Sequence, residues 1–337
     1  TNNNTLFESY VYGDYRRSTN NGAGWTAINT GLPAGTWLSA WHQDPVTAAT
    51  LYAGGRPAFY RSTNSGTNWS ALGTPSGSGS IIEFAIAPSN NQIIYTVKSN
   101  AVSRSTNGGT TWSNVTGTIP TASASLTNVA ISSTDPNKVW VTLSGFSATN
   151  KVFVTTDGGA TWTNFSVGLP NVPCNTIVYQ TGGANDPVYV GTDVGVFYKD
   201  NSQGAWTSFF SGLPRCGVRD LEIYYPTGRL RAATFGRGTW ESDLHTNGLD
   251  PPVAEFSSNQ LVCAGNSTVF TDLSSSTPTT WSWSFPGGTP STATGAGPHT
   301  ITYNTVGVYD AILTTSNAYG SDTETKTGYI TVVANTA

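Results

Sequence analysis

The stretch Ser105-Thr106-Asn107-Gly108-Gly109-Thr110-Thr111-Trp112 decides the fold, because the chain repeats it. Related octapeptides end at Trp25 (STNNGAGW), Trp69 (STNSGTNW) and Trp162 (TTDGGATW), and a worn copy ends at Trp206 (KDNSQGAW). The five tryptophans follow one another at intervals of 44, 43, 50 and 44 residues. A period of that size, filled with short apolar strands, is typical of a radial array such as a β-propeller.

The residue types of each octapeptide, called a box below, suit a hairpin loop between two strands. Ser or Thr at the first position offers a hydroxyl to the loop, Asn or Asp at the third caps the backbone, and Gly at the fifth supplies a positive φ. The Trp is expected to pack back against its blade while its N–H seeks an acceptor. A motif repeated in every blade does not define one active site, so we assign these residues a structural role. They are Ser18, Asn20, Gly22, Trp25, Ser62, Asn64, Gly66, Trp69, Ser105, Asn107, Gly109, Trp112, Thr155, Asp157, Gly159 and Trp162.

The boxes resemble the Asp-box, or BNR repeat (S-x-D-x-G-x-T-W), of sialidases, sortilin-type receptors and many secreted bacterial propellers. The resemblance covers roughly residues 1–245 and implies a β-propeller. Three of the four good boxes carry Asn (Asn20, Asn64 and Asn107) where the family prefers Asp, and only Asp157 conforms. This departure preserves the loop hydrogen bonds but argues against calcium or proton chemistry at the boxes.

Apolar alternation predicts the strands of each blade. The expected inner strands span 38–42, 81–86, 126–131 and 175–179, and the expected second strands span 50–53, 93–97, 139–143 and 188–191. The first blade (6–10 and 14–18) lacks an inner strand, and the last (218–225, 229–234 and 238–244) lacks a fourth strand and a box. Because these partial blades overlap instead of completing one another, we expect further blades upstream of Thr1.

Residues 246–252 read as a turn-rich linker, and the pattern changes at Val253. The run WSFPGG from Trp283 and the stretch HTITYNTVGVYDAIL from His299 resemble two motifs of the PKD domain, a small immunoglobulin-like sandwich. The resemblance covers 253–337, although both carboxylates of the family's first motif are replaced here. Strand alternation and turn spacing independently predict an antiparallel sandwich with a closing strand at 328–333. The expected fold class is therefore all-β: an Asp-box propeller, incomplete at its N-terminus, followed by a PKD-like sandwich.

The composition of the chain argues against two classes of partner, nucleic acids and the membrane interior. Charged residues make up 10% of the chain and the net charge is −4, which argues against nucleic acid as a partner. No apolar run approaches the roughly 18 residues of a membrane span, so membrane insertion is not expected. The Lys-poor, Thr- and Asn-rich composition is typical of a secreted or cell-surface bacterial protein. The chain contains no Met, so we expect Thr1 to be a processed or truncated end.

The three cysteines leave two interpretations open. Cys174 and Cys216 each follow a Gly-Leu-Pro turn and are expected to open the first strands of successive blades. They are therefore either a disulfide or two small buried thiols. Cys263 is expected to be a buried free thiol. Residues this scattered do not predict a metal site, and no motif in the chain predicts a cofactor.

A sialidase would need an arginine triad, a Tyr nucleophile backed by Glu, and an Asp acid. Five arginines crowd the last blade, but the family's R-I-P motif is absent and a triad draws on several blades. We interpret these arginines as salt-bridge partners within the last blade. They are Arg215, Arg219, Arg229, Arg231 and Arg237.

A glycosidase of another Asp-box family needs two facing carboxylates. Glu83 and Asp220 are the candidates, since they start inner strands, which line the channel of a propeller; Asn128 holds the comparable place between them. Single acids on separate strands are more often hydrogen-bonded edge residues than catalytic groups. His42 lacks the Cys, His or acid partners of a metal site.

Aromatic side chains on the expected loop face offer stacking area, and the low charge suits neutral polymers. The candidate binding residues are Trp37, Trp41, His42, Tyr224 and Tyr225. The first hypothesis is therefore a non-catalytic binding or structural module of an extracellular protein that recognises glycan or protein. One alternative is part of a secreted glycoside hydrolase whose active site is shared with upstream blades. Another is a self-associating unit of a surface fibre.

Overall fold

The computed structural model describes residues 5–10, 14–33, 40–56, 58–245, 251–276, 278–317 and 320–335. The predicted all-β class is confirmed: apart from one 3-10 turn, η1 (Tyr225–Thr227), the described elements are strands. The chain divides into two compact units, Thr1–Leu244 and His245–Ala337. Trp37, predicted to bind by stacking, lies outside the described residues.

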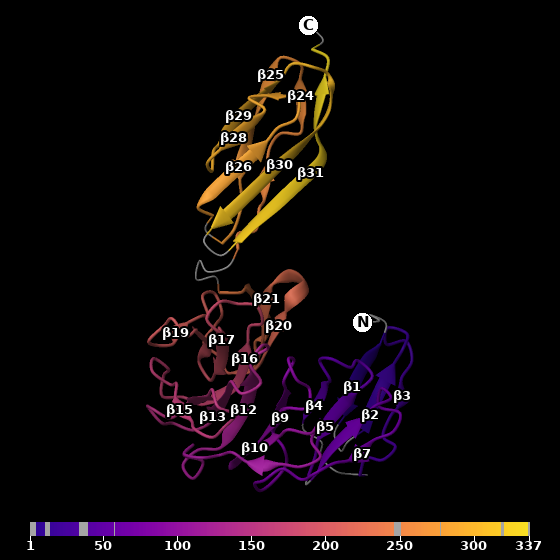
Figure 1. Cartoon of the computed structure of the whole chain (residues 1–337), viewed down its shortest axis with the longest axis vertical. Helices are drawn as coiled ribbons and strands as arrows, with labels where there is room; N and C mark the ends of the chain where they lie inside the picture. The colour runs from indigo at the N-terminus through magenta and orange to yellow at the C-terminus, as the bar shows by residue number, and fades with distance from the viewer. Residues whose placement is uncertain are drawn as a thin grey trace. The chain divides into compact units, whose positions relative to one another are not determined.

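The first unit consists of six antiparallel sheets that follow one another in chain order, as the colours of Figure 1 show. Four of these sheets have four strands: β4 (Ala40–Gln43), β5 (Leu51–Gly54), β6 (Phe59–Ser62) and β7 (Ser70–Ala71); β8 (Glu83–Ile86), β9 (Ile94–Lys98), β10 (Ala101–Ser105) and β11 (Ser113–Asn114); β12 (Leu126–Ile131), β13 (Val139–Leu143), β14 (Val152–Thr155) and β15 (Thr163–Asn164); β16 (Cys174–Tyr179), β17 (Val188–Thr192), β18 (Gly195–Lys199) and β19 (Thr207–Ser208). This succession of four-stranded sheets is typical of a β-propeller.

The first and last sheets have three described strands each. They are β1 (Leu6–Tyr10), β2 (Asp14–Ser18) and β3 (Thr26–Ala27), and β20 (Val218–Tyr224), β21 (Arg229–Thr234) and β22 (Gly238–Asp243). Leu6 pairs with Ser18 as Leu51 pairs with Ser62, so β1 is a second strand and the first blade has no described inner strand. The last blade has no described fourth strand. Both partial blades were predicted from the sequence.

The hydrophobic core lies between neighbouring blades. Every residue of β9, β13 and β17 is buried, which explains why these second strands are almost continuous apolar runs. One core cluster joins Val97 and Val102 to Val129, Ile131 and residues of β13. Each blade is therefore held by its neighbours as well as by its own hydrogen bonds.

The box loops have the predicted local geometry. Ser105 Oγ accepts a 2.8 Å hydrogen bond from Gly109 N, and Asn107 Oδ1 accepts one of 2.9 Å from Thr111 N. Gly109 has a φ of +88°, which explains the glycine. The corresponding bonds from the box glycine to the first-position hydroxyl measure 2.9 Å in the other three good boxes.

Trp69, Trp162 and Trp206 pack with apolar side chains of their own blades, as predicted, and they also bind the preceding blade. Trp69, Trp162 and Trp206 donate from Nε1 to the carbonyls of Ile28, Val115 and Phe165 at 2.7, 2.7 and 2.6 Å. Trp112 packs edge-on against Phe59 of the preceding blade, with 5.2 Å between ring centroids. Trp25, in the first blade, is 37% exposed. The box thus fastens one blade to the next.

Of the two interpretations left open for Cys174 and Cys216, the structure favours free thiols over a disulfide, with Cys174 buried and Cys216 half-buried. Cys174 pairs with Thr192 just before a register shift, and Val218, not Cys216, holds that place in the next blade by pairing with Thr234. Cys174 follows the proline of its Gly-Leu-Pro turn by four residues and Cys216 follows its own by two, so counting from the turn places Val218, not Cys216, at the position of Cys174. Cys263 is free, but it is half-buried rather than buried.

The second unit is a two-sheet sandwich. One sheet contains β23 (Phe256–Ser257), β25 (Asn266–Asp272), β29 (His299–Tyr303) and β27 (Gly288–Thr289); the other contains β24 (Leu261–Cys263), β31 (Gly320–Val333), β30 (Gly307–Asn317), β26 (Thr280–Ser284) and β28 (Thr292–Thr294). Its core is aromatic, with Phe256, Phe270, Trp283 and Phe285 buried together.

Two details of this sandwich differ from the prediction. The closing strand begins at Gly320 instead of residue 328, because residues 320–326 continue to pair with the second half of β30 beyond a register irregularity at Tyr309/Ala311. One strand pair is parallel rather than antiparallel, since β24 pairs with the end of β31. Neither pairing produces a local sequence signal.

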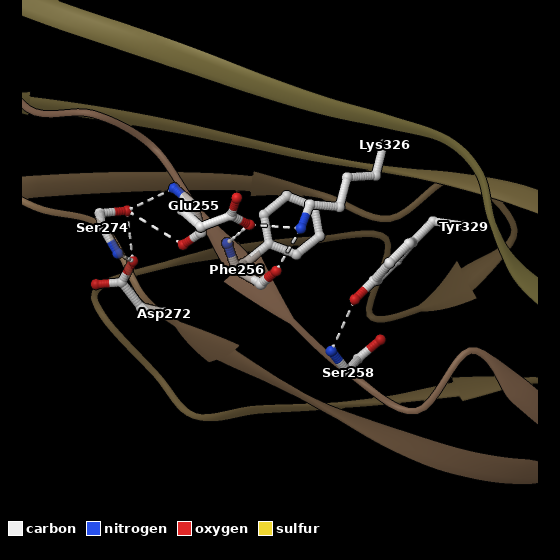
Figure 2. A network of polar contacts seen from close by, with 7 residues as sticks. All are labelled: Glu255, Phe256, Ser258, Asp272, Ser274, Lys326 and Tyr329. Atoms are coloured by element: carbon white, nitrogen blue, oxygen red, sulfur yellow. Dashed lines mark hydrogen bonds and ion pairs between the residues drawn. The ribbon is translucent and has the colours of Figure 1, made fainter. Parts of the chain in front are cut away.

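Side-chain contacts hold the short strand β23 in place (Figure 2). The Lys326 ammonium binds the Glu255 carboxylate and donates to the Phe256 carbonyl at 2.7 Å. It also lies 4.8 Å from the centre of the Phe256 ring and 5.3 Å from that of Tyr329. Glu255 N in turn donates to Ser274 Oγ at 3.1 Å. Lys326 belongs to β31, so this network ties the two sheets together.

Candidate functional site

A polar residue occurs at the same register position on four successive inner strands. Glu83, Asn128, Thr176 and Asp220 lie opposite Val97, Thr142, Gly191 and Ala233 of their second strands. In β12, β16 and β20 a register shift immediately precedes this residue. Such shifts re-aim side chains at the rims of β structures. The comparable placement of Glu83, Asn128 and Asp220 agrees with the sequence analysis, which missed Thr176.

Three of these four positions share a local hydrogen-bond pattern. The side-chain oxygens of Glu83, Asn128 and Asp220 each accept the backbone N–H of the following residue, at 2.8, 2.7 and 2.9 Å. Asn128 Nδ2 also lies 3.4 Å from Thr176 Oγ1 of the next blade. Each side chain is thus fixed at the start of its strand, and at least two neighbours are linked.

The inner strands enclose a cleft of about 320 Å³ in which these polar residues meet. Five strands, β4, β8, β12, β16 and β20, contribute to its walls. Its lining includes His42, Glu83, Asn128, Thr176, Tyr179 and Asp220. Polar groups that converge in one concave site are the usual mark of a ligand site.

His42 and Glu83 form a pair within the cleft. His42 Nε2 lies 2.7 Å from Glu83 Oε1, and the imidazole packs edge-on against Phe84 with 4.7 Å between ring centroids. The contact is a hydrogen bond when His42 is neutral and an ion pair when it is protonated. His42 therefore orients the Glu83 carboxylate.

The environment raises the pKa of Asp220 above its usual value. The main cause is burial against the cleft walls, and the charge of Glu83 adds to it. The N–H of Leu221, the charge of His42 and the Thr176 hydroxyl act in the opposite direction. Asp220 as a whole is nevertheless exposed, so water screens part of this effect. Asp220 and Glu83 are thus two carboxyl groups that line the same cleft.

Of the described Trp and Tyr candidates, only Tyr225 contacts the lining of the cleft through a hydrogen bond, and Tyr224 and Trp41 make other contacts. The Tyr225 hydroxyl accepts the N–H of Thr181 at 2.8 Å, and Thr181 lines the cleft, so this half-exposed ring lies at the cleft's rim. The Arg231 guanidinium lies 4.1 Å from the centre of the Tyr224 ring. Trp41 instead packs against Phe7 and Tyr15 of the first blade.

Three of the five clustered arginines form ion pairs. Arg229 contacts Asp243 at 3.1 Å and Arg231 contacts Glu241 at 2.8 Å, both between strands of the last blade. Arg219 reaches Asp193 of the preceding blade at 3.5 Å. The contacts of Arg229 and Arg231 agree with the predicted salt bridges within the last blade, whereas Arg219 pairs outside that blade. None of the three arginines lines the cleft.

In the part of the chain that the structure describes, no three side chains of the metal-binding types come together. The same residues include no helix that could cross a membrane.

Comparisons with known proteins agree with this architecture. A family model described as sortilin, neurotensin receptor 3, matches residues 57–176, and a PKD domain model matches residues 249–332. No curated protein sequence matches the chain.

Solved structures share the fold at low identity. An ancestral GH74 enzyme superposes with a TM-score of 0.60 at 14% identity, covering 95% of this chain and 52% of its own. The GH74 xyloglucanase from Xanthomonas campestris has a TM-score of 0.59 at 17% identity, and the match covers 71% of this chain and 42% of the xyloglucanase. YCF48 from Cyanidioschyzon merolae has a TM-score of 0.52 at 18% identity, and the match covers 72% of this chain and 79% of YCF48. The chain spans about half the length of the two GH74 enzymes. At these identities the comparisons show the fold alone.

Proposed function

We propose that the first unit is the glycan-binding module of an extracellular protein and that the inner-strand cleft is its binding site. One observation carries this proposal: five inner strands contribute to a single cleft in which His42, Glu83, Asn128, Thr176 and Asp220 converge. Imidazole, carboxylate, amide and hydroxyl groups together donate and accept hydrogen bonds, as a polyhydroxylated ligand requires. The Tyr225 ring at the rim adds a flat apolar surface.

The propeller and PKD combination supports a role outside the cell, as in secreted or surface-attached proteins. The low net charge of −4 favours a neutral polymer over a polyanion or polycation. Because one structural neighbour is a xyloglucanase, xyloglucan oligosaccharide is the first probe, followed by other soluble β-glucans.

The test is isothermal titration of the full chain with these oligosaccharides. We expect Asn128→Ala and Thr176→Val to weaken binding about tenfold or more, because each removes a hydrogen-bonding group from the cleft. Asp243→Asn is the matched control, since Asp243 is 81% exposed and pairs with Arg229 outside the cleft. Absence of binding to the whole panel, or equal binding by all three variants, would refute the proposal.

A second candidate function is glycoside hydrolysis at the same cleft, favoured by the raised pKa of Asp220 beside Glu83. In that reaction one carboxylic acid protonates the leaving oxygen and the other carboxylate acts as nucleophile or base. Release of reducing ends by the wild type, abolished in Asp220→Asn and Glu83→Gln with oligosaccharide binding retained, would establish it. Binding without any release by the wild type leaves the glycan-binding module as the function.

A further inference from the structure

The last blade is unfinished at its outer edge. In the complete blades, the third strand pairs on its outer side with a short fourth strand; for example, Tyr60 and Arg61 pair with Ala71 and Ser70. Trp240 holds the place of Tyr60 in β22, since it pairs with Ala232 as Tyr60 pairs with Ala53. Among the described residues, no strand pairs with the outer side of β22, and all of β22 is exposed.

The four other described blade interfaces share a feature that the last one lacks. At each of them a box tryptophan from the following blade packs onto the preceding blade, namely Trp69, Trp112, Trp162 and Trp206. The last blade has no box, and the residues after β22 (LHTNGLDPP) contain no Trp, Tyr or Phe. Leu244 N donates to Gly228 O, one step beyond the Arg229–Asp243 pair, so this contact extends the pairing of β22 with β21 and adds nothing on the outer side.

A cavity of about 180 Å³ lies where this tryptophan is missing. Trp206 belongs to a hydrophobic cluster that includes Phe165, Leu169, Val188, Val190 and Phe197. Their counterparts one blade later, by register and by position after the fourth strand, are Phe209, Leu213, Leu230, Ala232 and Trp240, and all five line the cavity. The cavity at the last blade interface therefore corresponds to the space that Trp206 fills at the preceding interface.

The cavity has the size and lining for one aromatic ring. An apolar protein cavity of about 150 Å³ accommodates benzene. The Phe209 ring is itself fixed by contacts with Tyr189 and Tyr198, at 5.3 and 6.3 Å between centroids, so this wall is rigid. The pocket lies beside the exposed edge of β22, which a short extended peptide can extend by antiparallel pairing.

We propose that this pocket and the β22 edge form a docking site for an extended segment of a partner polypeptide that carries a tryptophan. The segment pairs with β22 as β7 pairs with β6, and its indole fills the cavity as Trp206 fills the preceding one. The expected occupant resembles the chain's own box-to-strand segment, Trp followed by two polar residues and a large apolar residue, as in Trp162-Thr163-Asn164-Phe165. The site is separate from the inner-strand cleft, and no residue lines both.

The test uses the full chain and a fluorescein-labelled synthetic peptide with the sequence of residues 155–166, TTDGGATWTNFS. Fluorescence anisotropy should show saturable binding. The same peptide with Trp162→Ala is the matched control and should bind at least about tenfold more weakly. Equal binding of the two peptides, or no saturable binding of either, overturns the proposal without requiring any protein variant.

Two protein variants locate the site. Ala232→Phe places a ring in the cavity and should reduce peptide binding at least about tenfold, with folding checked by circular dichroism. Asn128→Ala alters the inner-strand cleft and should leave peptide binding unchanged. Peptide binding that is lost in Asn128→Ala but retained in Ala232→Phe would place the peptide in the cleft and refute the docking site.

Discussion

At the scale of single residues, the boxes act through a few buried hydrogen bonds. Ser105 is 1% exposed, and its hydroxyl accepts the buried N–H of Gly109 at 2.8 Å. Thr155 occupies the same place in the fourth box and makes the same bond at 2.9 Å. The natural repeat therefore shows that either a Ser or a Thr hydroxyl can accept this hydrogen bond.

We predict that Ser105→Ala destabilises the first unit by about 1–3 kcal/mol, because it leaves the buried N–H of Gly109 without an acceptor. Ser105→Thr keeps the hydroxyl and should cost less than about 1 kcal/mol. Urea unfolding followed by tryptophan fluorescence measures both values. A Thr variant as unstable as the Ala variant would show that packing, not the hydrogen bond, matters at this position.

The ionised carboxylate of Asp220, in contrast, destabilises the native state, since burial and the charge of Glu83 raise its pKa. The native state holds this proton more tightly than the unfolded chain. The ionised carboxylate therefore reduces stability as pH rises from the unfolded pKa of about 3.9 through the native pKa, and costs nothing below both. We predict that Asp220→Asn is more stable than the wild type at pH 7 and equally stable below about pH 4.

Asp157 is the control for this prediction, because hydrogen bonds from Thr161 lower its pKa. Its stabilising contribution is present above the unfolded pKa and is lost as pH falls. Asp157→Asn should therefore not stabilise the protein at pH 7. Thermal denaturation between pH 3 and pH 8 measures both variants. A less stable Asp220→Asn at pH 7 would contradict the assigned environment of Asp220.

At the scale of elements, each of the first four described blades is bound by the box of the following blade. The Trp162 indole, 8% exposed, donates to Val115 O at 2.7 Å across the interface. Gly159 of the same box packs against the Val115 side chain, with no room for a Cβ, since a Cβ would lie 2.7 Å from that of Val115. Strand pairing builds a blade, and the box loop fixes its neighbour.

We predict that Trp162→Phe destabilises the first unit by about 1–3 kcal/mol, since the Val115 carbonyl loses its donor and the smaller ring leaves a void. Trp25→Phe is the matched control, because Trp25 is 37% exposed in the first blade, and should change stability by less than about 0.5 kcal/mol. Chemical denaturation of both variants gives the two values. Similar losses would mean that the indole matters within its own blade rather than between blades.

At the scale of the whole molecule, the chain consists of two compact units, each with its own core. The sandwich core is built from Phe256, Phe270, Trp283 and other residues of the second unit alone. Units with separate cores usually unfold separately.

We therefore predict two thermal transitions in differential scanning calorimetry of the full chain. Residues 251–337 expressed alone should reproduce one of them, with its midpoint unchanged within a few degrees. A single transition for the full chain together with an unfolded isolated sandwich would show that the second unit depends on the first for its stability.

The cleft could be predicted only in part. The sequence pointed to Glu83, Asn128 and Asp220 because each opens a strand of the same kind. Thr176 carried no comparable signal, since Thr is common in strands. Trp41 and His42 are adjacent in the chain, yet His42 lines the cleft while Trp41 packs between blades. Successive strand residues face opposite ways, so assigning each face requires the register.

By itself, the sequence determined the all-β class, the blade order and the partial first and last blades. Those features depend on local signals, namely alternating apolar residues, turn glycines and the spacing of the boxes. Only the tertiary structure decided which side chains meet. It gave Val218, not Cys216, the register position in the last blade that Cys174 has in the preceding one. It also connected the box tryptophans to the preceding blade and left a pocket beside β22. The physical reason is that a register shift depends on how two separate strands pair, as Cys174 pairs with Thr192, and blade-to-blade packing joins residues more than forty positions apart, as Trp162 and Val115. No local pattern records either.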